Sequence, residues 1–173
     1  MEKLTAEYLR SILHYDPETG LFTWRERADM SPQWNGRYAG QRAGSPLPNK
    51  HTTYIRIKIN DRAYKAHRLA WLYVTGEWPS GRLDHRDGDG LHNWFDNLRE
   101  ATGTQNKGNS RRPSHNTTGL KGVRRSHNGK RWAAQIKING RYLHLGMYDT
   151  PELAHAAYVE AAKAHFGEFA NPG

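Results

Sequence analysis

The spacing of apolar residues changes several times along the first hundred residues, and each change predicts a new element of structure. Leu9, Ile12 and Leu13 form a helical stripe behind Thr5, which we expect to cap a short first helix. After it, the pattern predicts a turn, a strand, a long loop, a two-stranded hairpin and a second helix. These elements cover residues 16–20, 21–24, 25–50, 54–64 and 66–75, in that order.

After residue 119, apolar and polar positions alternate in short runs, and helical spacing follows them. The runs cover residues 122–124, 132–138 and 141–145. Asn-Gly pairs at 128–129 and 139–140 stand where tight hairpin turns are needed. Thr150 and Pro151 are residue types favoured at the cap and the first position of a helix. The pattern therefore predicts three antiparallel strands packed on one helix, and an α+β fold for the whole chain.

Positive charge is concentrated in one part of the chain, whose net charge is +9. Residues 1–100 hold 15 Lys and Arg against 13 Asp and Glu, which is nearly balanced. Residues 101–148 hold ten Lys and Arg and no acidic residue. A folded basic segment of this length fits a polyanion such as DNA or RNA. The alternative is a solvated basic face without a partner.

The composition excludes several classes of protein. There is no cysteine, so disulfides and cysteine-bound zinc are excluded, and a reducing cytoplasm is the expected location. No stretch approaches the roughly 18 apolar residues of a membrane span, and the N-terminal residues lack the apolar core of a signal peptide. We therefore expect no membrane partner.

The most specific chemical signal lies between residues 84 and 109. Asp84 and His85 are adjacent there, and Asn97 and Asn106 follow them. Hydrolysis of a phosphodiester needs a base with a pKa near neutrality to take a proton from water, and histidine is suited to this task. It also needs a divalent cation, and carboxylate and amide oxygens suit Mg²⁺. The acidic run at 87–90 does not continue with the ligand spacing of an EF-hand calcium loop.

Together with its neighbours, this stretch resembles the HNH nuclease family, and most closely its phage and intron-encoded branch, which includes homing endonucleases. The matching residues are 66–71 (AHRLAW), 76–79 (GEWP), 84–85 (DH), Asn93, 96–99 (DNLR) and 105–106 (QN). The resemblance implies a core of a two-stranded ribbon and a helix around one metal ion, preceded here by a helix and hairpin extension.

The resemblance also assigns roles to residues of the core. It implies that His85 is the general base, that Asp84 and Asn106 are the metal ligands, and that Asn97 orients His85. The implied cofactor is Mg²⁺ or Mn²⁺, with one ion per active site. His67, in the matching upstream helix, is either an active-site contact, together with Arg68, or a packed residue of that helix.

Residues 119–170 resemble the plant Apetala and ethylene-response-factor DNA-binding domain. The residues that match are 122–124 (GVR), 129–130 (GK), 132–136 (WAAQI), 145–150 (LGMYDT) and 154–162. This resemblance implies that the three-stranded sheet binds the major groove of double-stranded DNA. The residues expected to contact DNA are Arg99, Lys121, Arg124, Arg125, Lys130, Arg131, Lys137 and Arg141.

The boundary between the two regions is expected where the composition is that of a linker. We predict a nuclease region at 1–110 with its core at about 66–110, a linker at 111–118 and a DNA-binding domain at 119–173.

The resulting hypothesis is a divalent-metal-dependent DNA endonuclease, a monomer or homodimer, encoded by a phage or mobile element and located in the bacterial cytoplasm. Two alternatives stay open at this point: a non-catalytic DNA-binding regulator built on the HNH scaffold, and an RNA-binding or RNA-cleaving protein.

Overall fold

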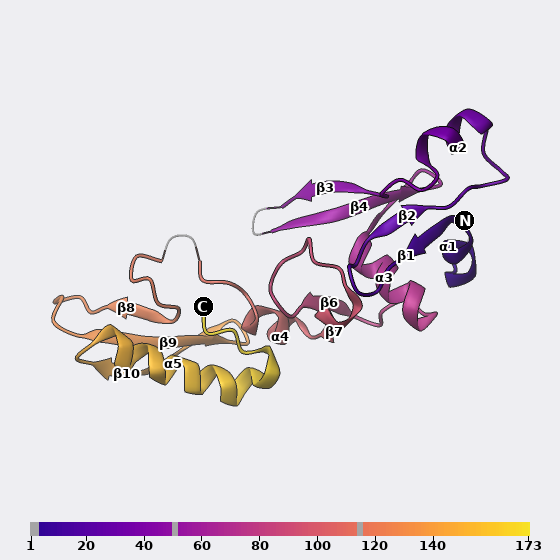
Figure 1. Ribbon diagram of the computed structural model, residues 1–173. Helices are drawn as coiled ribbons and strands as arrows, with labels where there is room; N and C mark the ends of the chain where they lie inside the picture. Colours follow the sequence, from indigo (N-terminus) through magenta and orange to yellow (C-terminus); the bar gives the residue numbers. More distant parts are fainter. Residues whose placement is uncertain (1–3, 50–51, 114–115) are drawn as a thin grey trace. The chain divides into compact units, whose positions relative to one another are not determined.

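The computed structural model describes residues 4–49, 52–113 and 116–173, and they form two compact units. The first unit is Met1–Glu100 and the second is Ala101–Gly173 (Figure 1). No helix among the described residues is long and apolar enough to cross a membrane. The boundary between the two units, after Glu100, precedes the predicted linker at 111–118. Residues 114 and 115 of that linker lie outside the described residues.

The first unit begins with helix α1 (Ala6–Ile12) and strands β1 (Leu13–Tyr15) and β2 (Phe22–Trp24). The predicted cap is confirmed, since the Thr5 hydroxyl accepts a hydrogen bond from the Tyr8 amide at 3.2 Å. The two strands pair antiparallel, and the predicted turn joins them. We call residues 13–24 the N-terminal hairpin.

The loop predicted for residues 25–50 is wrong for much of its length. The structure has helix α2 (Pro32–Tyr38) and strand β3 (Ser45–Pro48) there, while residue 50 lies outside the described residues. Helix α2 has a capping serine, Ser31, and a proline at its start, but it buries no residue and so shows no apolar stripe. Strand β3 contains two prolines and lies at the edge of its sheet, where prolines are tolerated.

The predicted hairpin and second helix are confirmed as β4 (Thr53–Ile59), β5 (Arg62–Lys65) and α3 (Ala66–Thr75). Strands β3, β4 and β5 form one antiparallel sheet in that order. Asn60 and Asp61 have φ of 47° and 61°, the left-handed values that a tight hairpin turn needs. Side chains of β4 and α3 pack with α1 and the N-terminal hairpin in one apolar core.

The middle of the chain forms a small two-stranded sheet of β6 (Arg82–His85) and β7 (Leu98–Ala101), with the short 3-10 helix η1 (Phe95–Asn97) before β7. The last residue of β7, Ala101, is the first residue of the second unit. Helix α4 (Gly103–Gly108) follows in the second unit and starts with a reciprocal capping box between Thr102 and Gln105.

The rest of the second unit has the predicted architecture. Strands β8 (Val123–Arg125), β9 (Trp132–Ile138) and β10 (Arg141–Tyr148) form an antiparallel sheet with β9 in the centre. Helix α5 (Pro151–Phe166) runs along the sheet (Figure 1), and the short helix η2 (Gly167–Phe169) ends the fold. Small residues such as Ala134 and Ala154 are completely buried, which lets helix and sheet lie close together. The predicted α+β class and the predicted sheet on one helix are thus confirmed.

A buried lysine connects the end of α4 to the rest of the second unit. Lys121 is 7% exposed, and its ammonium donates to the carbonyls of Gly108, Ser110 and Asn171 at 3.3, 2.5 and 2.7 Å. Burial lowers the pKa of Lys121 to about 8. We call this arrangement the Lys121 clasp. At the end of α4, a Cβ on Gly108 would lie 2.6 Å from the Phe166 ring, so this helix end is packed tightly on α5.

Replacing Lys121 by methionine should destabilise the protein, because the carbonyls of Gly108, Ser110 and Asn171 lose their ammonium donor and Gly108 is buried. The expected loss is about 1–3 kcal/mol of unfolding free energy. Urea unfolding of the full chain measures it, and Lys130→Met is the matched control because Lys130 is exposed. Equal stability of the two variants would show that the Lys121 clasp contributes nothing.

Candidate nuclease site and DNA-binding sheet

The candidate active site starts at the end of β6. Asp84 and His85 are the last two residues of this strand and are 5% and 6% exposed. Neighbouring side chains on a strand point to opposite faces. Both can be buried here because the strand stops at His85 and the chain turns into the following loop. The sequence-predicted metal ligand and general base therefore lie in the interior of the first unit.

Asp84 forms a buried ion pair with Arg99 of β7. The Nε and Nη2 atoms of Arg99 each lie 3.0 Å from Oδ2 of Asp84, and Arg99 is only 7% exposed. A buried charge needs such a partner. The guanidinium of Arg99 is thus engaged inside its own unit, and its burial removes it from the expected DNA contacts.

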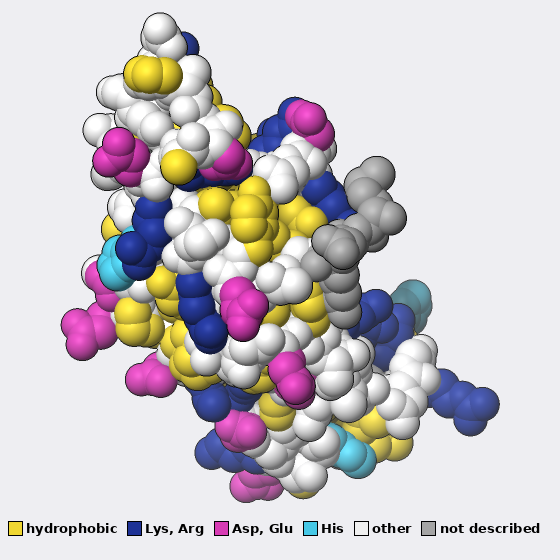
Figure 2. All heavy atoms as spheres, turned by 90° about the vertical axis from the view of Figure 1, so that its right-hand side faces the viewer, with side chains coloured by type: hydrophobic (Ala, Val, Ile, Leu, Met, Phe, Trp, Pro, Cys, Tyr) yellow, Lys and Arg dark blue, Asp and Glu magenta, His cyan; other side chains and the backbone are white. Residues whose placement is uncertain are grey.

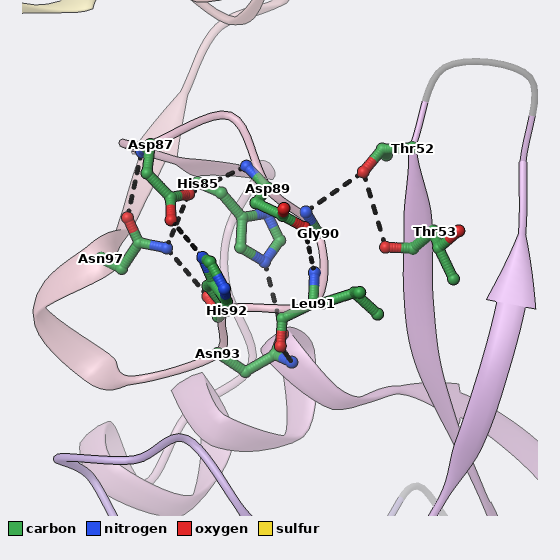
Figure 3. Close-up of polar contacts among 10 residues, drawn as sticks. All are labelled: Thr52, Thr53, His85, Asp87, Asp89, Gly90, Leu91, His92, Asn93 and Asn97. Carbon is green, nitrogen blue, oxygen red and sulfur yellow. Dashed lines mark hydrogen bonds and ion pairs between the residues drawn. The ribbon is translucent and has the colours of Figure 1, made fainter.

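The His85 ring contacts an asparagine that was given no role from the sequence. Its Nε2 lies 3.3 Å from Oδ1 of Asn93, a residue that is 2% exposed (Figure 3). Burial lowers the pKa of His85 below its usual value, while the hydrogen bond with Asn93 partly opposes this shift. The imidazole is therefore neutral at neutral pH, which is the form that can accept a proton.

Asn97 closes the loop of residues 86–97 that carries Asn93. Its side-chain nitrogen donates to the Asp87 carboxylate at 3.0 Å and to the His92 carbonyl at 2.8 Å, while its side-chain oxygen accepts from the Asp87 amide at 3.1 Å (Figure 3). Its own carbonyl accepts from the Arg86 amide at 2.8 Å. These contacts place Asn97 between the two ends of the loop, so any effect on His85 passes through the loop.

The acidic run at 87–90 has its own structural use in this loop. Asp87 accepts from the Asp89 amide at 2.9 Å, and Asp89 accepts from the Leu91 amide at 3.0 Å. Burial alone would raise the pKa of Asp87, but hydrogen bonds from Asp89, His92 and Asn97 bring it below its usual value. Backbone amides therefore stabilise these carboxylates as turn formers.

His67 of α3 packs beside His85. The two rings meet edge to face with centroids 5.0 Å apart, and the Tyr54 ring lies 5.3 Å from His67. Burial lowers the pKa of His67 to about 3, so this ring is neutral. Its Nδ1 is buried and lacks a hydrogen-bond partner among the described residues. Arg68, the next residue, donates to the Gly81 carbonyl at 3.1 Å.

The two expected metal ligands, Asp84 and Asn106, offer oxygen atoms, which suit a hard cation. The described residues contain no cluster of three or more His, Cys, Asp and Glu side chains, which a zinc site would use. Mg²⁺ keeps several waters and needs only one or two protein oxygens. A carboxylate has about four acceptor positions, so the ion pair of Asp84 with Arg99 is compatible with coordination of an ion. Asn106, the other expected ligand, is half-buried on α4 of the second unit.

One face of the second unit's sheet packs on α5, and basic side chains lie on the other. Arg124, Lys137 and Tyr142 are exposed there, and the Lys137 ammonium lies 4.9 Å from the Tyr142 ring centre. Lys130 and Arg141 are also exposed. The face shown in Figure 2 mixes acidic and basic side chains, so it is not the basic surface that residues 101–148 predict.

Three of the expected DNA contacts in the second unit are tied to the protein itself. Lys121 is buried in its clasp, which removes it from the expected contacts. Arg131 is exposed and pairs with Asp149 at 3.1 Å. Arg125 is exposed, donates to the Gly129 carbonyl at 3.1 Å and lies over the Trp132 ring.

Comparison with known proteins supports both family assignments, the HNH region and the C-terminal domain. Residues 64–107 match the family model described as HNH endonuclease, and residues 118–168 match that of the AP2 domain. Protein 3.8 of Escherichia phage T7 is 32% identical over 110 residues, which cover 63% of this chain and 90% of that protein. The chain belongs to the HNH family.

This HNH protein also carries a C-terminal AP2 domain, and the combination is that of a DNA-binding nuclease. All four residues assigned to catalysis and metal binding, Asp84, His85, Asn97 and Asn106, fall within the HNH match. HNH nucleases generally use a divalent metal ion. The remaining expected DNA contacts fall within the AP2 match.

Proposed function

We propose that this HNH protein is an endonuclease that hydrolyses phosphodiester bonds of double-stranded DNA with the help of a divalent metal ion. The observation that carries this proposal is the His85 ring. It is neutral, buried directly after Asp84 at the end of β6, and in contact with Asn93. A positioned neutral histidine is suited to take a proton from an attacking water.

Asp84 and Asn106 would hold the ion, Mg²⁺ or Mn²⁺, with one ion per active site. When bound, it would neutralise charge on the scissile phosphate and on the departing 3′ oxygen. Arg99 holds the Asp84 carboxylate in place through the buried ion pair, and Asn97 keeps the 86–97 loop closed behind His85.

The sheet of β8, β9 and β10 in the AP2 domain, called the AP2 sheet below, would supply affinity for DNA. The proposed contacts are Arg124, Arg125, Lys130, Arg131, Lys137 and Arg141. In this division of labour, the protein acts as a phage- or mobile-element-encoded enzyme in the cytoplasm of a host cell. A monomer with one site would nick DNA, and a homodimer would cut both strands.

One observation favours a second function. The ion pair with Arg99 gives Asp84 a structural use that needs no metal ion. A protein that kept this scaffold without catalysis would be a DNA-binding regulator.

Supercoiled plasmid separates the two functions. The full chain should nick or cut it in Mg²⁺ or Mn²⁺ and should be inactive in EDTA. Asp84→Asn and Asn106→Ala should each raise the metal concentration that half-maximal cleavage requires, because each removes one oxygen ligand or its charge. Unchanged metal dependence in both variants would refute the ligand assignment. DNA binding without cleavage at any metal concentration would support the regulator.

Removing two charges from the AP2 sheet should weaken binding without slowing chemistry. For Arg124→Ala/Lys137→Ala, we expect the slope of log affinity against log salt concentration to fall by up to about one per lost phosphate contact. Cleavage at saturating enzyme should be nearly unchanged. The control is Arg37→Ala/Lys58→Ala, which removes two exposed charges from the first unit. Loss of turnover with intact binding would mean that the AP2 sheet takes part in the chemical step.

A further inference from the structure

Asn93 lies between the candidate base and the N-terminal hairpin, and both polar atoms of its side-chain amide have hydrogen-bond partners. On one side its Oδ1 faces Nε2 of His85 at 3.3 Å. Its Nδ2 donates to the Leu91 carbonyl at 2.9 Å (Figure 3). A carbonyl oxygen only accepts, so the amide nitrogen must point to Leu91 and the amide oxygen must point to His85.

This orientation of the amide decides which ring nitrogen of His85 carries the hydrogen. The Asn93 oxygen is an acceptor, so Nε2 must be the donor in the neutral ring. The lone pair of the ring is then on Nδ1. A general base needs its lone pair on a defined nitrogen, because the other tautomer offers the water an N–H group instead.

The N-terminal hairpin contacts the backbone of Asn93 and its neighbours at three points. The buried Tyr15 hydroxyl donates to the Asn93 carbonyl at 2.7 Å. The Phe95 amide donates to the Pro17 carbonyl at 2.9 Å. Gly20 packs so closely that an added Cβ would lie 2.3 Å from the carbonyl carbon of Asn93. This turn had no assigned chemical role in the sequence.

We infer that Asn93 is a positioning residue that keeps the hydrogen of the His85 ring on Nε2, and that the N-terminal hairpin holds Asn93 in place. The catalytic meaning of this inference rests on the proposed function of His85 as general base. The tautomer itself can be observed without any cleavage assay.

Nitrogen NMR of the ¹⁵N-labelled full chain reads the tautomer, because a ring nitrogen with a hydrogen and one with a lone pair have different chemical shifts. The His85→Ala spectrum assigns the signals among the ten histidines. We expect the hydrogen on Nε2 in the unmodified protein. Asn93→Asp keeps an acceptor and should keep this tautomer, whereas Asn93→Leu should give a mixture. A hydrogen on Nδ1 in the unmodified protein would overturn the inference, as would an unchanged tautomer in Asn93→Leu.

Cleavage rates test the consequence. Asn93→Leu should lower kcat by about tenfold to a hundredfold, the usual cost of losing a residue that orients an active group, and should leave the Kd for DNA unchanged. Gly20→Ala should lower kcat as well, because its Cβ displaces the Asn93 backbone. Gly40→Ala is the matched control: its φ of +76° is close to the +74° of Gly20, but its Cβ would meet no atom within 4 Å.

The outcomes separate the two levels of the proposal. Equal kcat in Gly20→Ala and Gly40→Ala would refute the role of the hairpin. Full cleavage by His85→Ala would refute the proposed function, while the tautomer seen by NMR would still decide whether Asn93 fixes the ring.

Discussion

The His85→Ala variant should bind DNA as tightly as the unmodified protein and should cleave it at least about 10²–10⁴-fold more slowly, the usual effect of losing a general base. The base acts on water and not on the duplex, so affinity is spared. Plasmid nicking rates and DNA binding at the same salt concentration measure the two effects. His14→Ala is the control, because His14 is exposed on β1. An equal loss of binding and cleavage would point to misfolding of the variant.

The second large effect concerns stability. Arg99→Met should destabilise the first unit by about 3–5 kcal/mol, because the Asp84 carboxylate would stay buried without its cation. Arg82→Met is the control, since Arg82 is exposed on the same two-stranded sheet. Thermal or urea unfolding measures both variants.

A double variant isolates the contribution of the Asp84–Arg99 ion pair to stability. Asp84→Leu/Arg99→Met removes both charges, so it should regain much of the stability lost in Arg99→Met. If the double variant is as unstable as the sum of the two single variants, the ion pair is not the cause of the loss. This result would also weaken the view that Arg99 keeps Asp84 ready for a metal ion.

Elements marked by local residue chemistry could be predicted from the sequence. The turn at Asn60-Asp61, the turn at Asn139-Gly140 and the Thr150 cap each depend on neighbouring residues only, and all three are confirmed. Helix α2 has local signals too, at Ser31 and the proline after it. It was missed because it buries nothing, and an apolar stripe was the evidence required of a helix.

Burial of charged residues could not be predicted, because it depends on what the rest of the chain brings near. Arg99 and Lys121 are basic residues in a basic chain, and nothing in the neighbouring residues tells them from Arg124. The contact of Asn93 with His85 was missed for a similar reason. It depends on the path of the 86–97 loop and on a hairpin whose Tyr15 lies 78 residues before Asn93 in the sequence.

The Lys121 clasp has a consequence for any segment or label joined after Gly173. Asn171 accepts from Lys121 and donates to the Asn109 carbonyl at 3.1 Å, so the end of the described chain is tied down. Chain ends are usually frayed and open to proteases. Here a fluorophore attached after Gly173 would be held close to an anchored residue. An increase in the rotational mobility of the fluorophore would therefore report the opening of the second unit.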